Sequence, residues 1–273
     1  MNYLELGILD LLSSPILRTR IVMCILFIAV KQHPDFPLII AANRDEFHAR
    51  VTSPSHSWSD NPQLFAGRDE QAGGTWMGIH SSGRIAALTN IRAPQRERMD
   101  AKTRGELVVN ALEALDDNSF LETLRKTADE YNGYNLVYGN LDSLSVFNSH
   151  SLEHHQLTQG VYGLSNASLN TPWPKVQLGV DSLNKACQKS EELDIEDLFA
   201  ILHNREIASD EHLPDTGIAK PWEKMLSSIF ICSPDYGTRS STILTIDNTG
   251  TMNWQERSYD ANGVETGRVH HRG

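Results

Sequence analysis

Two apolar runs near the start of the chain constrain the fold more than any other feature. Residues 24–30 read CILFIAV and residues 38–43 read LIIAAN, with the polar segment KQHPDFP between them. Short apolar runs rich in β-branched residues and bounded by turn residues are typical of β-strands, so we predict a hairpin with a longer loop. The longest apolar stretch, residues 21–30, is far shorter than the roughly 20 residues that span a bilayer.

The rest of the chain alternates between pairs of strands and pairs of helices. Helical spacing of apolar residues occurs in residues 103–115, 118–131, 172–190 and 194–204. Strand patterns occur in residues 73–91, 134–140, 143–149, 160–167, 228–233, 241–247 and 251–259. Hairpins grouped between helices predict an α+β fold with mostly antiparallel sheets covered by helices, and not a parallel doubly wound fold.

The connecting segments carry three further expectations. Residues 43–62 are polar and rich in turn residues, so we predict a loop at the rim of a sheet. The helix at residues 118–131 is predicted to begin with Asn118 or Ser119 as its cap. The polar residues 260–273 are predicted to fray.

Charge and cysteine content narrow the class of protein. The net charge of −11 disfavours nonspecific binding to nucleic acid or to an anionic membrane. Three widely separated cysteines favour neither a disulfide framework nor a zinc ribbon, so a reducing cytoplasm is the simplest compartment. Residues 1–22 lack a basic start and a clear cleavage site, and therefore do not resemble a signal peptide.

The cysteine that opens the first apolar run has two interpretations. Cys24 can be a small buried residue inside a strand, which is common for free cysteine. Alternatively, Met23 initiates translation and is removed, which leaves Cys24 with a thiol and a free α-amine. An α-amine has a pKa of about 8 and can act as the base for its own thiol.

Polar side chains at predicted strand ends are the other candidates for a site. The string NRDE places Arg44 and Asp45 where a hairpin returns beside Cys24. Asn90 and Asn166 are candidate oxyanion donors, and Arg239 precedes a late strand among several hydroxyls. Each has an ordinary alternative, since asparagine is a common turn residue and arginine a common partner in surface ion pairs.

Eleven histidines raise the question of a metal or haem. The chain contains neither an H-E-x-x-H nor a C-x-x-C-H pattern, so no zincin or covalent haem site is indicated. A noncovalent haem site needs only one or two axial groups and an apolar cleft, which the sequence neither demonstrates nor excludes.

Nine motifs in fixed order resemble a known family. They are MCILFIAV, AANRDEF, GGTWMGI, GRIAALTNIR, TRGELV, YNLVYG, GLSNASLNTPWPKV, LPDTG and YGTRSSTIL. Together they look like the NRDE, or Transport and Golgi organisation protein 2, family from Met23 to about Tyr259. The resemblance begins at the Met-Cys pair, which favours Met23 as the functional start.

The resemblance implies a four-layer αββα sandwich of the N-terminal-nucleophile hydrolase type. Acylases of similar arrangement use a terminal cysteine, an arginine and an aspartate on the second strand, two asparagines and a late arginine. Cys24, Arg44, Asp45, Asn90, Asn166 and Arg239 match those places. The acylases have two residues between the arginine and the aspartate, whereas Arg44 and Asp45 are adjacent. Adjacent strand residues face opposite sides, so only one of them faces the site, or Glu46 takes the place of the acid.

The family is also associated with haem mobilisation and with lipid or acyl-CoA handling. We therefore expect a cytoplasmic binding or trafficking protein for noncovalently bound haem or a similar amphipathic ligand, with no nucleic-acid partner and no transmembrane segment. The alternative is a Cys24-dependent hydrolase of an amide or thioester bond. We expect residues 1–22 to be an extension outside the functional protein, residues 23–260 a single domain, and residues 261–273 a polar tail.

Overall fold

The computed structural model describes residues 23–188 and 192–273. The expected extension at residues 1–22 lies outside the described residues. Thirteen strands and five helices are assigned in the described part of the chain. The strands are β1 (Met23–Val30), β2 (Leu38–Phe47), β3 (Thr52–Ser57), β4 (Leu64–Asp69), β5 (Met77–His80), β6 (Ile85–Asn90), β7 (Tyr134–Gly139), β8 (Ser145–Asn148), β9 (His154–Gln156), β10 (Gly160–Leu164), β11 (Tyr236–Ile246), β12 (Met252–Tyr259) and β13 (Glu265–Arg272). The helices are α3 (Gly105–Glu113), α4 (Asp117–Thr127), α5 (Pro174–Gln188), α6 (Ile195–Leu202) and α7 (Lys220–Met225), with short 3-10 turns at Pro94–Arg96 and Ala128–Glu130.

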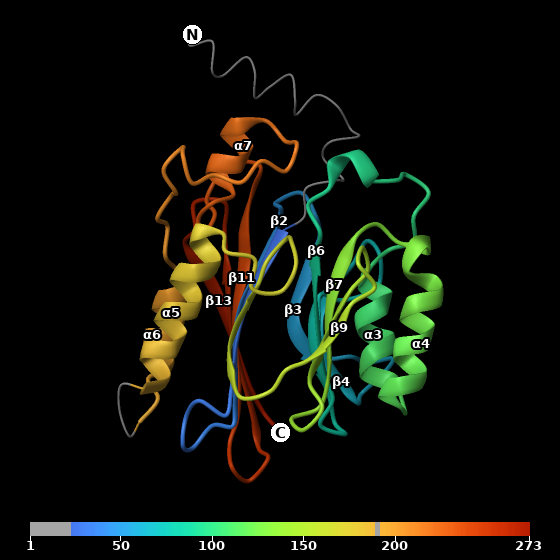
Figure 1. The fold of residues 1–273 in the computed structure, drawn as a ribbon. Helices are drawn as coiled ribbons and strands as arrows, with labels where there is room; N and C mark the ends of the chain where they lie inside the picture. The colour runs from blue at the N-terminus through green and yellow to red at the C-terminus, as the bar shows by residue number, and fades with distance from the viewer. Residues whose placement is uncertain (1–22, 189–191) are drawn as a thin grey trace.

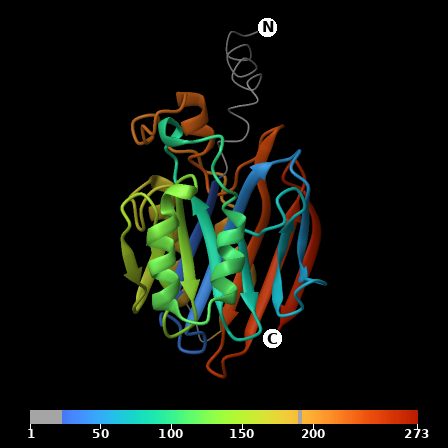
Figure 2. The ribbon, with the colours of Figure 1, turned by 90° about the vertical axis from the view of Figure 1, so that its right-hand side faces the viewer.

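Two antiparallel sheets pack face to face between two helix layers. One sheet has the strand order β10-β1-β2-β11-β12-β13, and the other runs β3 to β9 in sequence order. Figure 1 shows α5 and α6 outside the first sheet and α3 and α4 outside the second. Figure 2, seen from the side of α3 and α4, shows both helices lying across the face of their sheet. The α+β, four-layer αββα sandwich is confirmed.

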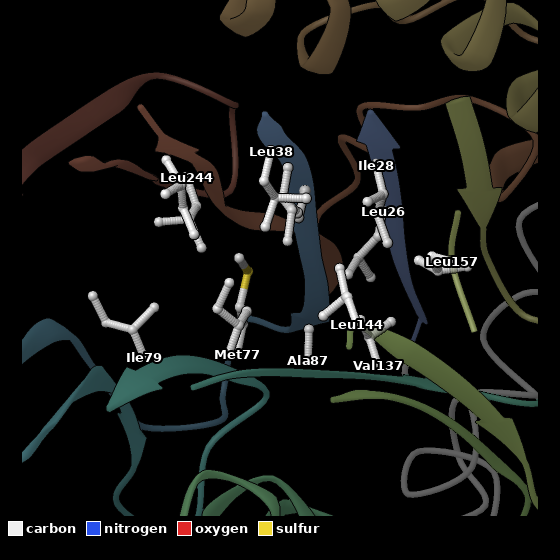
Figure 3. Packing of buried hydrophobic residues seen from close by; sticks show 14 of the residues in the cluster. Leu26, Ile28, Leu38, Met77, Ile79, Ala87, Val137, Leu144, Leu157 and Leu244 are labelled. Carbon is white, nitrogen blue, oxygen red and sulfur yellow. The ribbon is translucent and has the colours of Figure 1, made fainter. Parts of the chain in front are cut away.

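The central strands are buried on both faces, which explains their unbroken apolar sequence. On β1, Leu26 and Ile28 point into the space between the sheets, where they meet Met77 and Val137 of the second sheet (Figure 3). The alternate residues of the same strand, such as Phe27, pack under α5 and α6. The period of two therefore divides every residue of β1 and β2 between a sheet-facing side and a helix-facing side.

Most predicted elements are present. The hairpin of the two apolar runs is confirmed, since β1 and β2 pair antiparallel from Met23 opposite Asp45 to Val30 opposite Leu38. The four predicted helices are α3, α4, α5 and α6, and Pro174 is the first residue of α5. A proline fits there because the first turn of a helix needs no backbone N–H from that residue.

Several local predictions are wrong. The predicted loop at residues 43–62 contains the end of β2 and all of β3, because both segments find partners in a sheet. The cap of α4 is Asp116, whose carboxylate accepts from the Ser119 N–H, and is neither Asn118 nor Ser119. Residues 228–233 form no strand, and the tail predicted to fray contains β13, which pairs along β12.

No helix between residues 23 and 188 or between 192 and 273 has the length and apolar character needed to cross a membrane.

Candidate functional site

A cavity of about 400 Å³ opens between the two sheets, at the end of the sandwich where β1 begins and β2 and β6 end. In Figure 1 this end of the sandwich is the upper one, where α7 also lies. Four of the six residues singled out in the sequence line this cavity, namely Cys24, Arg44, Asn90 and Arg239. Asp45 and Asn166 lie close by but outside the lining.

Strand pairing explains which side chains reach the cavity. Cys24 lies directly opposite Arg44, and Met23 lies opposite Asp45. Directly opposed residues in an antiparallel pair share one face of the sheet. The side chains of Cys24, Arg44 and Glu46 therefore face the cavity between the sheets, whereas Asp45 faces the helix layer. Of the alternatives left open by the sequence, Arg44 and Glu46 face the cavity and Asp45 does not.

The Cys24 thiol is buried within this arrangement. It is 4% exposed, although it borders the cavity. Burial raises its pKa to about 12; the Asp45 carboxylate adds to the rise, and the Arg44 guanidinium opposes it. The thiolate is the nucleophilic form of cysteine, so a chain that retains Met23 holds Cys24 in its unreactive form at neutral pH.

Arg44 has hydrogen-bonding capacity that no group in the described part of the chain uses. Its Nη2 lies 3.6 Å from a carboxylate oxygen of Glu46, a contact of ion-pair distance. Its Nη1 is buried and has no hydrogen-bond partner among the described residues. Buried polar groups in proteins are nearly always paired, so an unpaired guanidinium nitrogen beside a cavity indicates a place for an acceptor.

Arg239 occupies an irregular position in β11. The register against β2 shifts between Thr238 and Ser240, which leaves Arg239 as the extra residue of a β-bulge. Its Nη1 donates to the backbone carbonyls of Phe47, His48 and Arg50 at 2.9–3.3 Å. Arg239 therefore holds the chain that leaves β2 against the cavity.

The two asparagines lie one behind the other. Asn90 lines the cavity at the end of β6, and the Asn166 side-chain amide donates to the Asn90 carbonyl at 3.0 Å. The Asn166 side-chain oxygen accepts from the Ser165 hydroxyl at 2.9 Å, and that hydroxyl also lies 3.4 Å from the Cys24 carbonyl. Asn166 thus positions the strand ends that carry Cys24 and Asn90.

Sequence reasoning missed several residues of the cavity wall. Arg104 is half-buried, lies 3.7 Å from Glu97 and donates to the Gly133 carbonyl at 3.1 Å. It belongs to the motif TRGELV, whose apolar spacing predicts a helix and gives no role to Arg104. The motif GGTWMGI packs so closely against the motif TRGELV that a Cβ on Gly74 would lie 2.5 Å from the Gly105 backbone. The two motifs therefore meet in one wall, and the glycines Gly74 and Gly105 are the trace that this close approach leaves in the sequence.

The cavity is lined by many charged groups. The basic lining residues are Arg44, Arg50, Arg68, Lys102, Arg104 and Arg239, and the acidic ones are Glu46, Asp69 and Glu256. Burial raises the pKa of both Glu46 and Glu256, which favours their neutral forms. Arg50 pairs with Asp69 at 2.6 Å, and Arg68 pairs with Asp60 at 2.7 Å. Arg44, Arg104 and Arg239 lack such a close carboxylate partner among the described residues.

The uncharged part of the wall completes the picture of what the cavity can hold. Trp76, Leu88 and Tyr259 supply apolar surface beside the arginines. Of the side chains that line this cavity, Cys24 and Tyr259 are the ones with an atom suited to ligate haem iron. Within residues 23–188 and 192–273 there is no group of three or more His, Cys, Asp or Glu side chains arranged to hold a metal ion. The wall therefore combines cationic donors with apolar surface, which suits an amphipathic anion.

Comparison with known proteins places these features in a family context. The family described as Transport and Golgi organisation 2 matches residues 23–261. A cattle protein named Transport and Golgi organization protein 2 homolog is 35% identical over 261 residues, covering 86% of this chain and 93% of the cattle protein. The fruit fly Transport and Golgi organization protein 2 is 28% identical over 262 residues, covering 86% of this chain and 92% of that protein. Among solved structures, a mutant conjugated bile acid hydrolase from Clostridium perfringens is similar with a TM-score of 0.47 and 9% identity, with 92% of each chain covered.

Proposed function

The chain belongs to the Transport and Golgi organisation 2 family, and we propose that it binds a small anionic amphipathic molecule, haem or an acyl compound, in the cavity beside Cys24. The observation that carries this proposal is the buried Nη1 of Arg44, at the edge of the cavity, which lacks a hydrogen-bond partner among the described residues. A carboxylate or phosphate oxygen of a ligand would supply the missing acceptor. Trp76 and Leu88 would contact the apolar part of the same molecule.

The guanidinium nitrogen of Arg44 that has no partner in the described chain carries a free-energy cost. A buried polar group without a partner costs about 1–3 kcal/mol, and a hydrogen bond to a charged group contributes about 1.5–3 kcal/mol. A ligand anion that pairs with Arg44 therefore gains affinity of about 10-fold or more from this single contact. Arg239 lies on the same wall and has no carboxylate partner within ion-pair distance among the described residues.

Haem as cargo fits the donor set in two respects. Its propionates would pair with Arg44 or Arg239, and Cys24 or Tyr259 would be available as an iron ligand. Neither His nor Met occurs among the residues that line this cavity, so the usual imidazole and thioether ligands would not act here. We further propose that the protein acts as a carrier in the cytoplasm, which is consistent with the free state of Cys24, Cys187 and Cys232.

The test is a binding titration with two named probes. Haemin is followed by its Soret band, and oleate is followed by calorimetry. We expect saturable one-to-one binding of at least one probe and a loss of about 10-fold or more in affinity for Arg44→Met. Arg68→Met is the matched control, because Arg68 lines the same cavity but is already paired with Asp60 at 2.7 Å. Absence of binding by both probes, or equal losses in the two variants, would reject the proposal.

A second function is favoured by one specific observation. Cys24, Arg44 and Asn90 line one cavity, so a thiol, a cation and a side-chain amide border the same space. If the working chain begins at Cys24, its α-amine can take the thiol proton while the sulfur attacks a carbonyl carbon. The amine then passes that proton to the departing amine or thiol, and water hydrolyses the acyl-cysteine to regenerate the thiol. Asn90 would donate to the oxyanion.

Hydrolysis is tested with a p-nitrophenyl ester and a synthetic acyl thioester. We expect turnover from a chain that begins at Cys24 and none from its Cys24→Ala variant. Cys187→Ala is the control, because that buried thiol lies on α5, in the core between the helices and the first sheet, and does not line the cavity. Equal turnover with and without the Cys24 thiol would exclude the second function and leave the binding proposal intact.

A further inference from the structure

A buried lysine near Cys24 takes no part in the function proposed above. Lys175 is the second residue of α5 and is only 3% exposed. Its Nζ has no hydrogen-bond partner among the described residues. Lysine is almost never fully buried unless it is paired, so this position requires an explanation beyond packing.

A buried carboxylate near Lys175 also has an oxygen atom without a hydrogen-bond partner in the described part of the chain. Asp45 is fully buried, and its Oδ1 accepts from the Thr238 hydroxyl at 2.7 Å. Its Oδ2 is buried without a hydrogen-bond partner in the described part of the chain. Burial raises the pKa of Asp45 to about 6, and the Lys175 ammonium is the strongest charge acting against that rise. Lys175 and Asp45 therefore interact electrostatically, yet no ion pair within 4 Å joins them in the described structure.

Met23 lies beside Lys175 and Asp45. It lies opposite Asp45 in the β1–β2 register, and its side chain is buried against Leu226, Ile231 and Tyr236. The Met23 N–H donates to the Tyr236 hydroxyl at 2.9 Å. In a chain that retains Met23, an uncharged amide and a thioether therefore occupy the space next to two unpaired ionisable atoms.

The chemistry of this place changes if Met23 is removed. The nitrogen of Cys24 then becomes an amine, which can take a proton and needs an acceptor in a buried setting. Asp45 Oδ2 is the open acceptor on the helix-facing side of β1. The Lys175 ammonium and the Arg92 guanidinium, which reaches the Met23 sulfur at 3.3 Å, are cations that disfavour a second ammonium beside them.

We propose that Asp45 and Lys175 form a receptor for the α-amino group of Cys24, in which Asp45 holds the amine and Lys175 keeps it unprotonated. This inference rests on the second proposed function, because the neutral amine is the form that takes the thiol proton. Lys175 is a positioning residue here: it acts through the amine and touches no substrate. The titratable groups that act on Lys175 are Asp45, Cys24 and Glu223, and Arg92 is the opposing cation.

The experiment measures the protonation of the amine directly. A chain that begins at Cys24 contains every described strand and helix except the first residue of β1, and it is labelled with cysteine carrying ¹³C at the carbonyl. Three carbonyl signals are expected, from Cys24, Cys187 and Cys232, and only that of Cys24 should titrate with its adjacent α-amine. Folding of each variant is checked by the dispersion of its amide proton signals.

Variants at the two positions should move the titration in opposite directions. Lys175→Met removes a neighbouring cation and should raise the pKa of the amine by about one pH unit or more. Asp45→Asn removes the neighbouring anion and should lower it by a similar amount. Lys175→Arg keeps the charge and should restore the original value. Lys185→Met, an exposed lysine of the same helix, should leave it unchanged.

The results separate this inference from the function on which it rests. Opposite shifts without any turnover would reject the hydrolase and keep the receptor. Turnover without any shift in Lys175→Met or Asp45→Asn would reject the receptor and keep the hydrolase. If Lys175→Met fails to fold, an unchanged titration in Asp45→Asn is sufficient to overturn the inference.

Discussion

Replacement of Asn43 by alanine should destabilise the fold without weakening ligand binding in the cavity. Asn43 is the first letter of the NRDE motif and is fully buried on the helix-facing side of β2. Its Nδ2 donates to the carbonyls of Leu202 and Ile229 at 2.8 and 2.9 Å. Its Oδ1 accepts from the Ser241 hydroxyl at 2.6 Å. The side chain therefore connects β2 to the end of α6, to the segment before β11 and to β11 itself.

The magnitude follows from those three contacts. Each buried polar group left without a partner costs about 1–3 kcal/mol. A water molecule that enters the vacated space restores part of the loss, so we expect Asn43→Ala to lower the free energy of unfolding by about 3–5 kcal/mol. For a urea m-value of about 3 kcal/mol per M, the unfolding midpoint should fall by roughly 1–1.7 M.

The assay is urea unfolding followed by circular dichroism and tryptophan fluorescence. Asn248→Ala is the matched control, because its exposed side chain donates to a single carbonyl, that of Pro34. We expect the control to lose less than about 1 kcal/mol. A loss below about 1 kcal/mol for Asn43→Ala would refute the assignment of this motif residue to stability. A loss of ligand affinity in the folded variant as large as that of Arg44→Met would refute it equally.

Three further predictions concern packing, reactivity and pH. Gly179→Ala should lower the free energy of unfolding by about 1–3 kcal/mol in thermal unfolding, because the added Cβ would lie 2.0 Å from the Phe27 ring; an unchanged midpoint would show that α5 moves freely away from β1. In a chain that retains Met23, iodoacetamide at pH 8 should alkylate Cys24 at least about 100-fold more slowly than the exposed Cys232, because burial raises the pKa of Cys24 to about 12. Peptide mass spectrometry follows both rates, and comparable rates would contradict this prediction. Burial raises the pKa of Glu256 above its unfolded value, so the folded state binds the proton more tightly than the unfolded state does. The wild type should therefore lose stability relative to Glu256→Gln as the pH rises above about 4. A constant difference in unfolding free energy between the two proteins from pH 4 to 7 would contradict this prediction.

The predictable parts of the fold are those with strong local patterns. The β1–β2 hairpin, α3 and α5 follow from apolar periodicity and from turn or helix-start residues close in sequence. The missed elements lack such patterns. β3 contains a proline and few apolar residues, and β13 is polar and mostly exposed. Each becomes a strand because a neighbouring strand offers backbone hydrogen bonds, which local sequence does not report.

The candidate site was partly predictable for a similar reason. Cys24, Arg44, Asn90 and Arg239 line one cavity, and all four lie in strands or at their ends. Arg104 was missed because it precedes a helix and reaches the cavity only through the contact of Gly74 with Gly105. Local sequence cannot show contacts between segments this far apart in the chain.

The NRDE motif separates what each level decides. Once residues 38–47 form a strand, the period of two places Arg44 and Glu46 on one side and Asn43 and Asp45 on the other, which the sequence alone determines. Only the tertiary structure decides that the first side faces a cavity and the second faces the helix layer. It also brings Lys175 close enough to Asp45, 130 residues earlier in the chain, for their charges to interact, because α5 packs on β1, and no local rule of sequence encodes that proximity.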